Sequence, residues 1–526
     1  MKALRVEPAE VALDTREGEP GLADFTAIAT FDDDTEGPLD LVAWSVTSVS
    51  AGDIDQSGHF IASEFNGGNT EIIANHVGIE GRATLTSVFR DSIFDEVDES
   101  IAEAFAAADI TDDDGASFIY PPDGVTVPRN ISGFVFQWHG TAEQVAHLRF
   151  RSATTDISVY AQGDQWRPDA DLWTRIAAVN RQGSVTVQVE TADWDGDALT
   201  NVHRGPEIEI TVNRFDARGS VLYWASSDRA IMRIPFGEEA PARFWPVTDD
   251  GHSCIGCHAL SEARQRMVVT ADGVNGTYAV IDVANPDQPR TLVDYDGNKR
   301  ATFHALSGDG GYMVGVAGGA LTLYDFDTMA VVGPVDTGGY WVTHPDWSQD
   351  GSSLLYVRQT GNHNNDMNFA GGEIVQVPWD GSTFGTPTVL VPRDLTWNNY
   401  YPAYSPDGNW IAYNRSTGDA YADEDAELWL ISRDGSINIR LDTANAEARG
   451  LNSYPRWGPL SDDDVMWLAF SSKRSYVPKR TDKPQIWVSA IDPALASTGV
   501  DPSKPAFWMP GQDSSQNNHL PVWWSQ

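Results

Sequence analysis

The sequence holds two cysteines, and both lie in one short run that ends in a histidine, Cys254-Ile255-Gly256-Cys257-His258. Two thiols three positions apart can form thioether bonds with the two vinyl groups of a haem, and the imidazole that follows can then bind the iron. The run therefore predicts one covalent haem c held by Cys254, Cys257 and His258. A disulfide and a zinc site are the alternatives, but zinc needs further ligands and a thioredoxin-like pair needs a β-α-β context.

The second iron ligand has several candidates. His304 is favoured because residues 303–307 repeat the pattern of residues 257–261 and place His304 at the position that His258 occupies in its own repeat. Met267 would be a cross-strand neighbour of His258 in a tight hairpin, at about 5 Å, which is too near for a porphyrin between them. An open position is another possibility, and the further candidates are Met313, His252, His344 and His519. Two imidazoles favour a low potential, a methionine raises it, and an open position permits peroxide or small-gas chemistry.

Acidic residues form short clusters elsewhere in the chain. Asp193, Asp195 and Asp197 alternate around a glycine, a pattern that suits calcium, but Arg204 stands where an EF-hand loop needs its last acidic residue. A solvated loop is therefore the main interpretation, with calcium as the alternative. The chain has no Gly-x-Ser-x-Gly elbow, phosphate-binding glycine loop or His-Glu-x-x-His run, so nothing in the sequence supports hydrolytic catalysis.

Short alternating apolar runs between Gly, Asp, Asn and Pro predict β-strands almost throughout the chain. From residue 220 onward one pattern recurs six times, and several copies continue with an Asp-Gly turn and a second strand, as in a propeller blade. The copies are residues 257–261, 303–307, 344–348, 401–405, 454–458 and 520–525. Residues 221–226 look like a second strand without a first, and residues 520–525 like a first strand without a second. The C-terminus should therefore complete the blade that begins near Ser220.

The Ser-Pro-Asp-Gly turn at residues 405–408, with the later strands at 470–474 and 485–488, resembles the TolB-type six-bladed propeller family over residues 215–526. Residues 1–116, with Trp44 and the strand at 58–62, resemble bacterial Ig-like domains. Residues 117–214, which follow a proline-rich boundary at Pro121-Pro122, look like a fibronectin-type sandwich. The expected fold is all-β, with two N-terminal β-sandwiches followed by a six-bladed β-propeller.

The charge balance argues against partners that carry many negative charges. With 76 acidic and 35 basic residues, the net charge is -41, which repels nucleic acid and anionic membrane surfaces. The sequence has no run of eighteen apolar residues that would predict a membrane span. The first ten residues have no apolar segment typical of a signal sequence. By analogy with c-type cytochromes, thioether attachment is made outside the cytoplasmic membrane, so we expect a periplasmic or cell-surface protein whose signal sequence is absent here.

Two classes of function remain. The first is a mono-haem c-type cytochrome for electron transfer or redox sensing, with a redox protein as partner. The second is a surface binding or assembly protein in which the haem is structural, and self-assembly stays open. A haem peroxidase is a third, weaker hypothesis.

Overall fold

The structure is a computed structural model, which describes residues 1–246, 252, 254–361, 365–421, 423–446, 452–460, 465–474 and 483–526. The chain divides into two compact units. The first contains residues 1–130 and 134–214, and the second contains residues 131–133 and 215–526. Strands dominate both units, as the alternating apolar pattern predicts. Within the described part of the chain, no helix is long and apolar enough to cross a membrane.

The first unit combines small sheets with one large sheet. The small sheets are β1 (Ala3–Glu7), β4 (Thr26–Thr30) and β5 (Glu36–Pro38); β3 (Leu22–Asp24), β8 (His59–Ala62) and β7 (Gly52–Ile54); and β12 (Phe118–Tyr120), β14 (Phe136–Trp138) and β17 (Gln165–Trp166). The large sheet follows the order β11 (Thr111–Asp112), β19 (Leu199–Arg204), β18 (Gly183–Trp194), β15 (Val145–Arg151), β16 (Thr155–Gln162), β10 (Ile79–Asp95), β9 (Gly68–His76) and β6 (Ala43–Val46), with β2 (Glu10–Thr15), β13 (Val125–Val127) and β20 (Ile208–Val212) as branches. Its helices are α1 (Ser100–Ala107), η1 (Asp114–Ala116) and α2 (Ala170–Val179).

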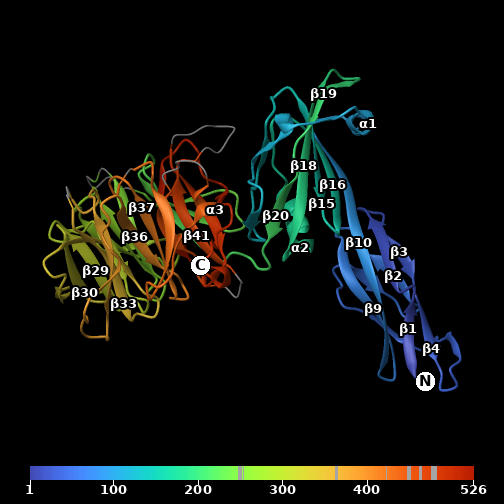
Figure 1. The fold of residues 1–526 in the computed structure, drawn as a ribbon, viewed down its shortest axis with the longest axis horizontal. Coiled ribbons are helices and arrows are strands. Elements are labelled where there is room, and N and C mark those ends of the chain that lie inside the picture. The colour runs from blue at the N-terminus through green and yellow to red at the C-terminus, as the bar shows by residue number, and fades with distance from the viewer. Residues whose placement is uncertain are drawn as a thin grey trace. The chain divides into compact units, whose positions relative to one another are not determined.

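Strand β10 joins the two halves of this unit (Figure 1). Its first part pairs antiparallel with β9 and parallel with β2, and its last seven residues pair parallel with β16. One apolar core lies around Trp44 and Phe60, and a cluster of aromatic rings packs around Phe136, whose ring centroid is 5.1 Å from that of Phe150. Two cores therefore share one continuous sheet, and the division into two sandwiches at residues 116 and 117 stays a prediction.

The second unit is a β-propeller whose described residues form six four-stranded antiparallel sheets (Figure 1). Five sheets follow chain order: β24 (Ile255–Ser261), β25 (Arg266–Ala271), β26 (Tyr278–Asp282) and β27 (Arg290–Val293); β28 (Phe303–Leu306), β29 (Tyr312–Ala317), β30 (Ala320–Asp325) and β31 (Val331–Pro334); β32 (Trp341–Trp347), β33 (Ser353–Gln359), β34 (Gly372–Pro378) and β35 (Thr388–Val391); β36 (Asn398–Tyr404), β37 (Trp410–Ser416), β38 (Glu427–Ser432) and β39 (Asn438–Arg440); β40 (Ser453–Trp457), β41 (Met466–Ser472), β42 (Gln485–Ile491) and β43 (Phe507–Trp508). The sixth combines β44 (Asn518–Trp524) with β21 (Ser220–Ala225), β22 (Ala230–Pro235) and β23 (Ala242–Pro246), and two short helices are α3 (Asp442–Asn445) and α4 (Pro493–Ala496).

The first strands of the six sheets form a closed ring, which we call the central ring. Strands β24, β28, β32, β36, β40 and β44 contact one another in that order, and β44 also contacts β24. Closure comes from the pairing of β44 with β21, which the two unmatched strand patterns predict. Because each first strand has neighbours on both sides, residues near its centre lie at the axis of the propeller.

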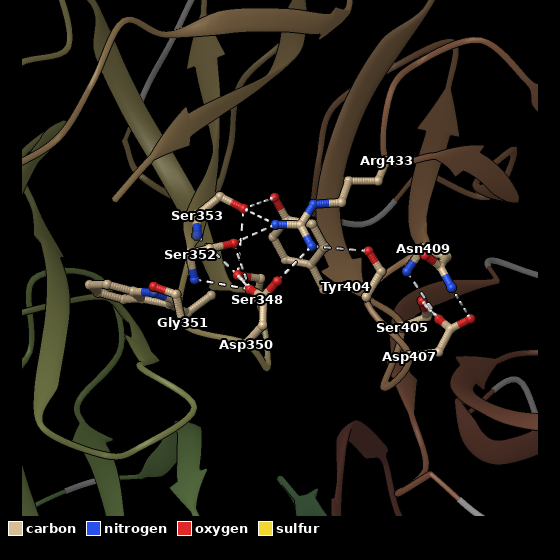
Figure 2. Close-up of polar contacts among 12 residues, drawn as sticks. Ser348, Asp350, Gly351, Ser352, Ser353, Tyr404, Ser405, Asp407, Asn409 and Arg433 are labelled. Carbon is tan, nitrogen blue, oxygen red and sulfur yellow. Dashed lines mark hydrogen bonds and ion pairs between the residues drawn. The ribbon is translucent and has the colours of Figure 1, made fainter. Parts of the chain in front are cut away.

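The turn after a first strand is held by a repeated Ser-x-Asp-Gly motif (Figure 2). Ser348 Oγ donates to Asp350 Oδ1 at 2.6 Å, Ser352 N–H donates to the same oxygen at 2.9 Å, and Ser353 N–H donates to Ser348 Oγ at 3.0 Å. Arg433, in the β38–β39 hairpin, donates to Asp350 at 2.9 Å and to Ser352 Oγ at 2.6 Å. The motif recurs after two other first strands, at residues 307–312 and 405–410, and also between β38 and β39, at residues 432–437. These turns close hairpins, and Arg433 links the sheet of β36–β39 to the sheet of β32–β35.

Candidate functional site

Five of the six first strands share one irregularity at the centre of the ring. Each has a shift of register and one residue with φ between 35° and 59°, and these residues are Cys257, His344, Tyr401, Tyr454 and Leu520. Four of them precede a proline, which has no N–H for the strand ladder and is suited to a β-bulge. In β24 the following residue is His258, and in the regular strand β28 the equivalent residue is His304. The two histidines therefore stand where the other first strands have proline.

The side chains at the bulge level pack together across the ring. The ring centroids of Phe303 and His344 are 4.7 Å apart, those of His344 and Tyr401 are 3.8 Å apart and stacked, and those of Tyr401 and Tyr454 are 4.4 Å apart. Cys257 belongs to the same apolar core as Phe303, Tyr401 and Tyr454. The residues that the bulge turns inward thus form an apolar, aromatic centre around the second cysteine.

The two cysteines are free thiols in different surroundings. Cys254 is partly exposed, whereas Cys257 is 8% exposed. Burial, together with the nearby Cys254 thiol, raises the pKa of Cys257 to about 12, so this thiol is protonated at neutral pH. Between them, Gly256 lies against the indole of Trp224, where an added Cβ would be 3.3 Å from the ring. The flanking residues Gly251 and Ser253 lie outside the described part of the chain.

His258 is buried, and its ring has no hydrogen-bond partner. Its exposure is 8%, and neither ring nitrogen is within hydrogen-bond distance and angle of an acceptor or donor. Its pKa is lowered to about 3, mainly by burial and also by the charge of Arg456, although a contact with the backbone of Leu222 raises it. The imidazole is therefore neutral, the form in which histidine binds a metal. Two unbonded thiols and a neutral imidazole with unpartnered nitrogens fit the donor set of a haem c.

His304 has the same properties in the next sheet. It is 8% exposed, its two ring nitrogens are unpartnered, and burial lowers its pKa to about 3 against a small opposing effect of the Cys257 backbone. Its ring packs edge-on against Tyr278 at 5.0 Å between centroids. The structure thus places His304 beside the backbone of Cys257, and its role as an iron ligand stays a prediction.

The other candidates for the second ligand fall into two groups. The expected pairing of Met267 with His258 is wrong, because Met267 pairs with Leu260 and the cross-strand partner of His258 is Val269. Met267 lies in an apolar core between sheets and Met313 lies in another such core, so both thioethers are packed as core side chains. The three histidine candidates have polar or aromatic contacts. His252 binds Asp272 through Nδ1 at 2.7 Å, His344 stacks on Tyr401, and His519 lies 5.8 Å from Trp224 and 6.1 Å from Tyr454.

Two charged residues of the central ring were not predicted from the sequence. Asp346 and Arg456 each lie two positions after a bulge residue, on β32 and β40. Burial raises the pKa of Asp346 to about 6, although Arg456 and the N–H of Tyr404 at 2.8 Å both lower it. The signal available was the repeat itself, because alanine holds the same place at residues 259, 305 and 403.

The acidic loop proposed as a calcium alternative uses its oxygens for local hydrogen bonds. Asp193 accepts from Gln144 at 3.0 Å and from Asn201 at 2.7 Å, and Asp195 accepts two backbone N–H groups at 2.9 Å. In the described ranges no group of three His, Cys, Asp or Glu side chains is placed to hold a metal ion. Calcium at this loop stays untested.

Comparisons with known proteins relate the chain to other propellers. No protein-family model matches it, and no curated protein does. A TolB protein from Agrobacterium tumefaciens is 18% identical with a TM-score of 0.34, over 58% of this chain and 97% of that one. A chain of the nidogen/laminin complex is 12% identical with a TM-score of 0.39, over 58% and 99%. The dihydro-haem d1 dehydrogenase NirN is 16% identical with a TM-score of 0.32, over 56% and 55%.

Proposed function

We propose that this protein is an extracytoplasmic mono-haem c-type cytochrome that acts in electron transfer or redox sensing. Cys254 and Cys257 bind the haem as thioethers, and His258 binds its iron. The observation that carries the proposal is the combination of two unbonded thiols three positions apart with a buried imidazole whose nitrogens are both unpartnered. Buried polar atoms normally have hydrogen-bond partners, so the unpartnered nitrogens point to a ligand.

The residues around the proposed site have distinct tasks. The bulge at Cys257 turns its thiol toward the centre of the ring, and burial keeps His258 neutral so that it can bind iron. The aromatic side chains of Phe303, Tyr401 and Tyr454 exclude water from this region. When bound, the haem supplies one-electron chemistry. Burial keeps the Cys257 thiol protonated in the folded chain.

His304 is the proposed second ligand. It stands at the same position of the neighbouring first strand as His258, and its unpartnered nitrogens and lowered pKa match those of His258. Met267 and Met313 are packed in apolar cores, which disfavours a methionine ligand. Two imidazoles imply a low-spin haem of low potential.

We assign residues 1–116 and 117–214 to two β-sandwiches and residues 215–526 to a TolB-like propeller of six blades, closed by β44. Thioether attachment implies a periplasmic or cell-surface protein, and the net charge of -41 favours a redox partner with a positively charged face.

The deciding experiment is production of the chain in the periplasm together with a c-type haem maturation system. We expect a haem-stained band on a denaturing gel, a c-type pyridine haemochrome and sharp low-spin bands. Cys254→Ala with Cys257→Ala should remove the stain, and His258→Gly should keep it while changing the spin state. His139→Gln, at an exposed histidine of the first unit, is the control that should change neither. Colourless wild-type protein would overturn the proposal.

A further inference from the structure

Three polar side chains meet on one face of the large sheet of the first unit, where β15, β16 and β18 run side by side (Figure 1). His147 lies on β15, and its cross-strand partners are Tyr160 on β16 and Glu190 on β18. Ser158 lies two residues before Tyr160, so its side chain is on the same face of the sheet. A serine, a histidine and a carboxylate therefore come together from three adjacent strands.

Hydrogen bonds join these three side chains in one order. Nε2 of His147 is 3.1 Å from Ser158 Oγ, and Nδ1 is 2.9 Å from Glu190 Oε2. An ionised carboxylate only accepts, so the neutral imidazole carries its proton on Nδ1 and leaves Nε2 to accept from the serine hydroxyl. In this arrangement a histidine can take the proton of a serine nucleophile while a carboxylate orients its ring.

The surroundings keep the carboxylate ionised and the imidazole in one orientation. Burial raises the pKa of Glu190, but hydrogen bonds from His147 and Arg204 outweigh it and hold this pKa below its ordinary value. Arg204 donates from Nε to Glu190 Oε1 at 2.7 Å, which leaves Oε2 for His147. The His147 ring stacks on Tyr160 at 4.5 Å between centroids and packs against Phe105 of α1 at 5.5 Å.

Arg149 brings a positive charge beside the serine. It is the direct cross-strand partner of Ser158, and such partners have Cβ atoms about 5 Å apart. Its Nε and Nη2 donate to the two carboxylate oxygens of Asp156 at 2.9 and 3.0 Å, so this ion pair engages two of its three nitrogens. A guanidinium at this place can stabilise negative charge on a carbonyl oxygen that Ser158 attacks. Ser158 is only partly buried, so a small molecule can reach it.

We propose that Ser158, His147 and Glu190 form a second functional site, which hydrolyses small carboxylic esters with Ser158 as the nucleophile. This inference does not depend on the proposed haem. The three residues form no sequence motif, because such triads are defined by geometry and not by their order in the chain. Glu190 is a positioning residue, since it acts through His147.

The reaction needs no group beyond the ester and water. Ser158 Oγ bonds to the ester carbonyl carbon while its proton passes to His147 Nε2. The bond from that carbon to the alcohol oxygen breaks, and His147 gives the proton to the leaving alcohol. Water then attacks the acyl-serine, again with its proton taken by His147, and the carboxylic acid and the free serine hydroxyl are restored.

The test treats the full chain with a fluorophosphonate, which bonds covalently to activated serine hydroxyls, and locates the adduct by peptide mass spectrometry. We expect one adduct, on Ser158. The labelling rate should fall by at least about 100-fold in His147→Gln, because a general base contributes factors of about 10²–10⁴. Hydrolysis of p-nitrophenyl acetate is measured in the Cys254→Ala, Cys257→Ala background, where no thiol reacts with the ester. Ser158→Ala should abolish it, and Glu190→Gln should lower kcat with little change in KM.

Ser92→Ala and His203→Gln are the matched controls. Ser92 is the partner of Ser158 on β10, and His203 pairs with a different carboxylate, Asp113, at 2.8 Å. Both variants should label and hydrolyse as wild type does. Folded wild-type protein without an adduct on Ser158, or equal labelling rates in wild type and His147→Gln, would overturn the inference and leave the proposed function standing. The wild-type adduct is read directly, so this outcome does not depend on the folding of any variant.

Discussion

At the scale of single residues, the propeller buries histidines in their neutral form. Burial lowers the pKa of His258 and His304 to about 3, that of His519 to about 4 and that of His344 well below 6.5. A base whose pKa is lower in the folded chain contributes stability that is complete above its unfolded pKa of about 6.5 and is lost as pH falls. Acid should therefore weaken the fold through these four side chains.

We predict that the haem-free double variant Cys254→Ala, Cys257→Ala loses stability steeply between pH 6.5 and pH 5. Each of the four histidines contributes at most about 1.4 kcal/mol per pH unit, so the limit is about 5 kcal/mol per unit. Asp346 opposes them, because its raised pKa gives stability at low pH that is lost as pH rises through about 6. Urea unfolding at pH 7, 6 and 5 measures the slope.

The same measurement on two further variants assigns the effect. His304→Phe should reduce the slope by about one proton, because its buried imidazole no longer has to be charged on unfolding. His139→Gln changes an exposed histidine and should leave the slope as it is. An equal slope in His304→Phe and its parent would mean that burial does not hold this imidazole neutral.

At the scale of elements, two turns of one kind differ in their contacts with the side chain of Arg433. Asp350 and Asp434 each accept from the serine two positions before and from the backbone two positions after, but Asp350 also binds Arg433 (Figure 2). We predict that Asp350→Ala and Asp434→Ala both destabilise the protein, since several hydrogen bonds to a carboxylate are lost. Asp350→Ala also removes the ion pair with Arg433. Because this pair is partly exposed, the further decrease in the free energy of unfolding should be at most about 1 kcal/mol.

Thermal unfolding of the two variants in the Arg433→Gln background separates these contributions. The extra loss at Asp350 should disappear in that background, whereas the loss at Asp434 should persist. If Asp350→Ala still destabilises the protein more than Asp434→Ala in the Arg433→Gln background, the difference comes from the turns themselves and not from the ion pair between the sheets.

The bulges of the first strands make a second prediction about elements. Leu520 has a φ of 50°, a region that is strained for β-branched side chains. Leu520→Ile, which keeps the volume, should therefore destabilise the propeller by about 1–2 kcal/mol. Val522→Ile, two positions later in the same strand β44, is the comparison and should cost less than the bulge variant. Equal melting temperatures for Leu520→Ile and wild type would contradict the assigned strain.

The repeat made the strands predictable, but it did not reveal the bulges. The alternating patterns placed the first strands, and the unmatched patterns near Ser220 and Leu520 predicted the pairing that joins them. The spacing of Cys254, Cys257 and His258 also indicated a site directly. Asp346 and Arg456 were missed because three other copies of the repeat have alanine at their place, and residues on different sheets come together only through closure. The domain boundary at residue 116 stays a prediction, and β10 pairs with strands from both sides of it.

At the scale of the whole molecule, the dominant property is charge. The net charge of -41 creates a negative potential around the protein that attracts cations and repels anions at low ionic strength. The Debye length is about 30 Å at 0.01 M salt and about 3 Å at 1 M, so salt removes this long-range effect. Electron exchange with a haem in this protein should therefore depend on the charge of the redox reagent.

We predict that a small cationic oxidant reacts with the reduced haem protein at least about tenfold faster than an anionic oxidant of equal driving force at 0.01 M salt. The ratio should approach that of a free haem peptide at 1 M salt, where screening leaves only intrinsic reactivity. Stopped-flow oxidation across a salt series, with the haem peptide measured beside the protein, gives both ratios. A ratio that does not change with salt would show that the haem is shielded from the field of the surface carboxylates, and a redox partner would then have to be recognised by contacts other than charge.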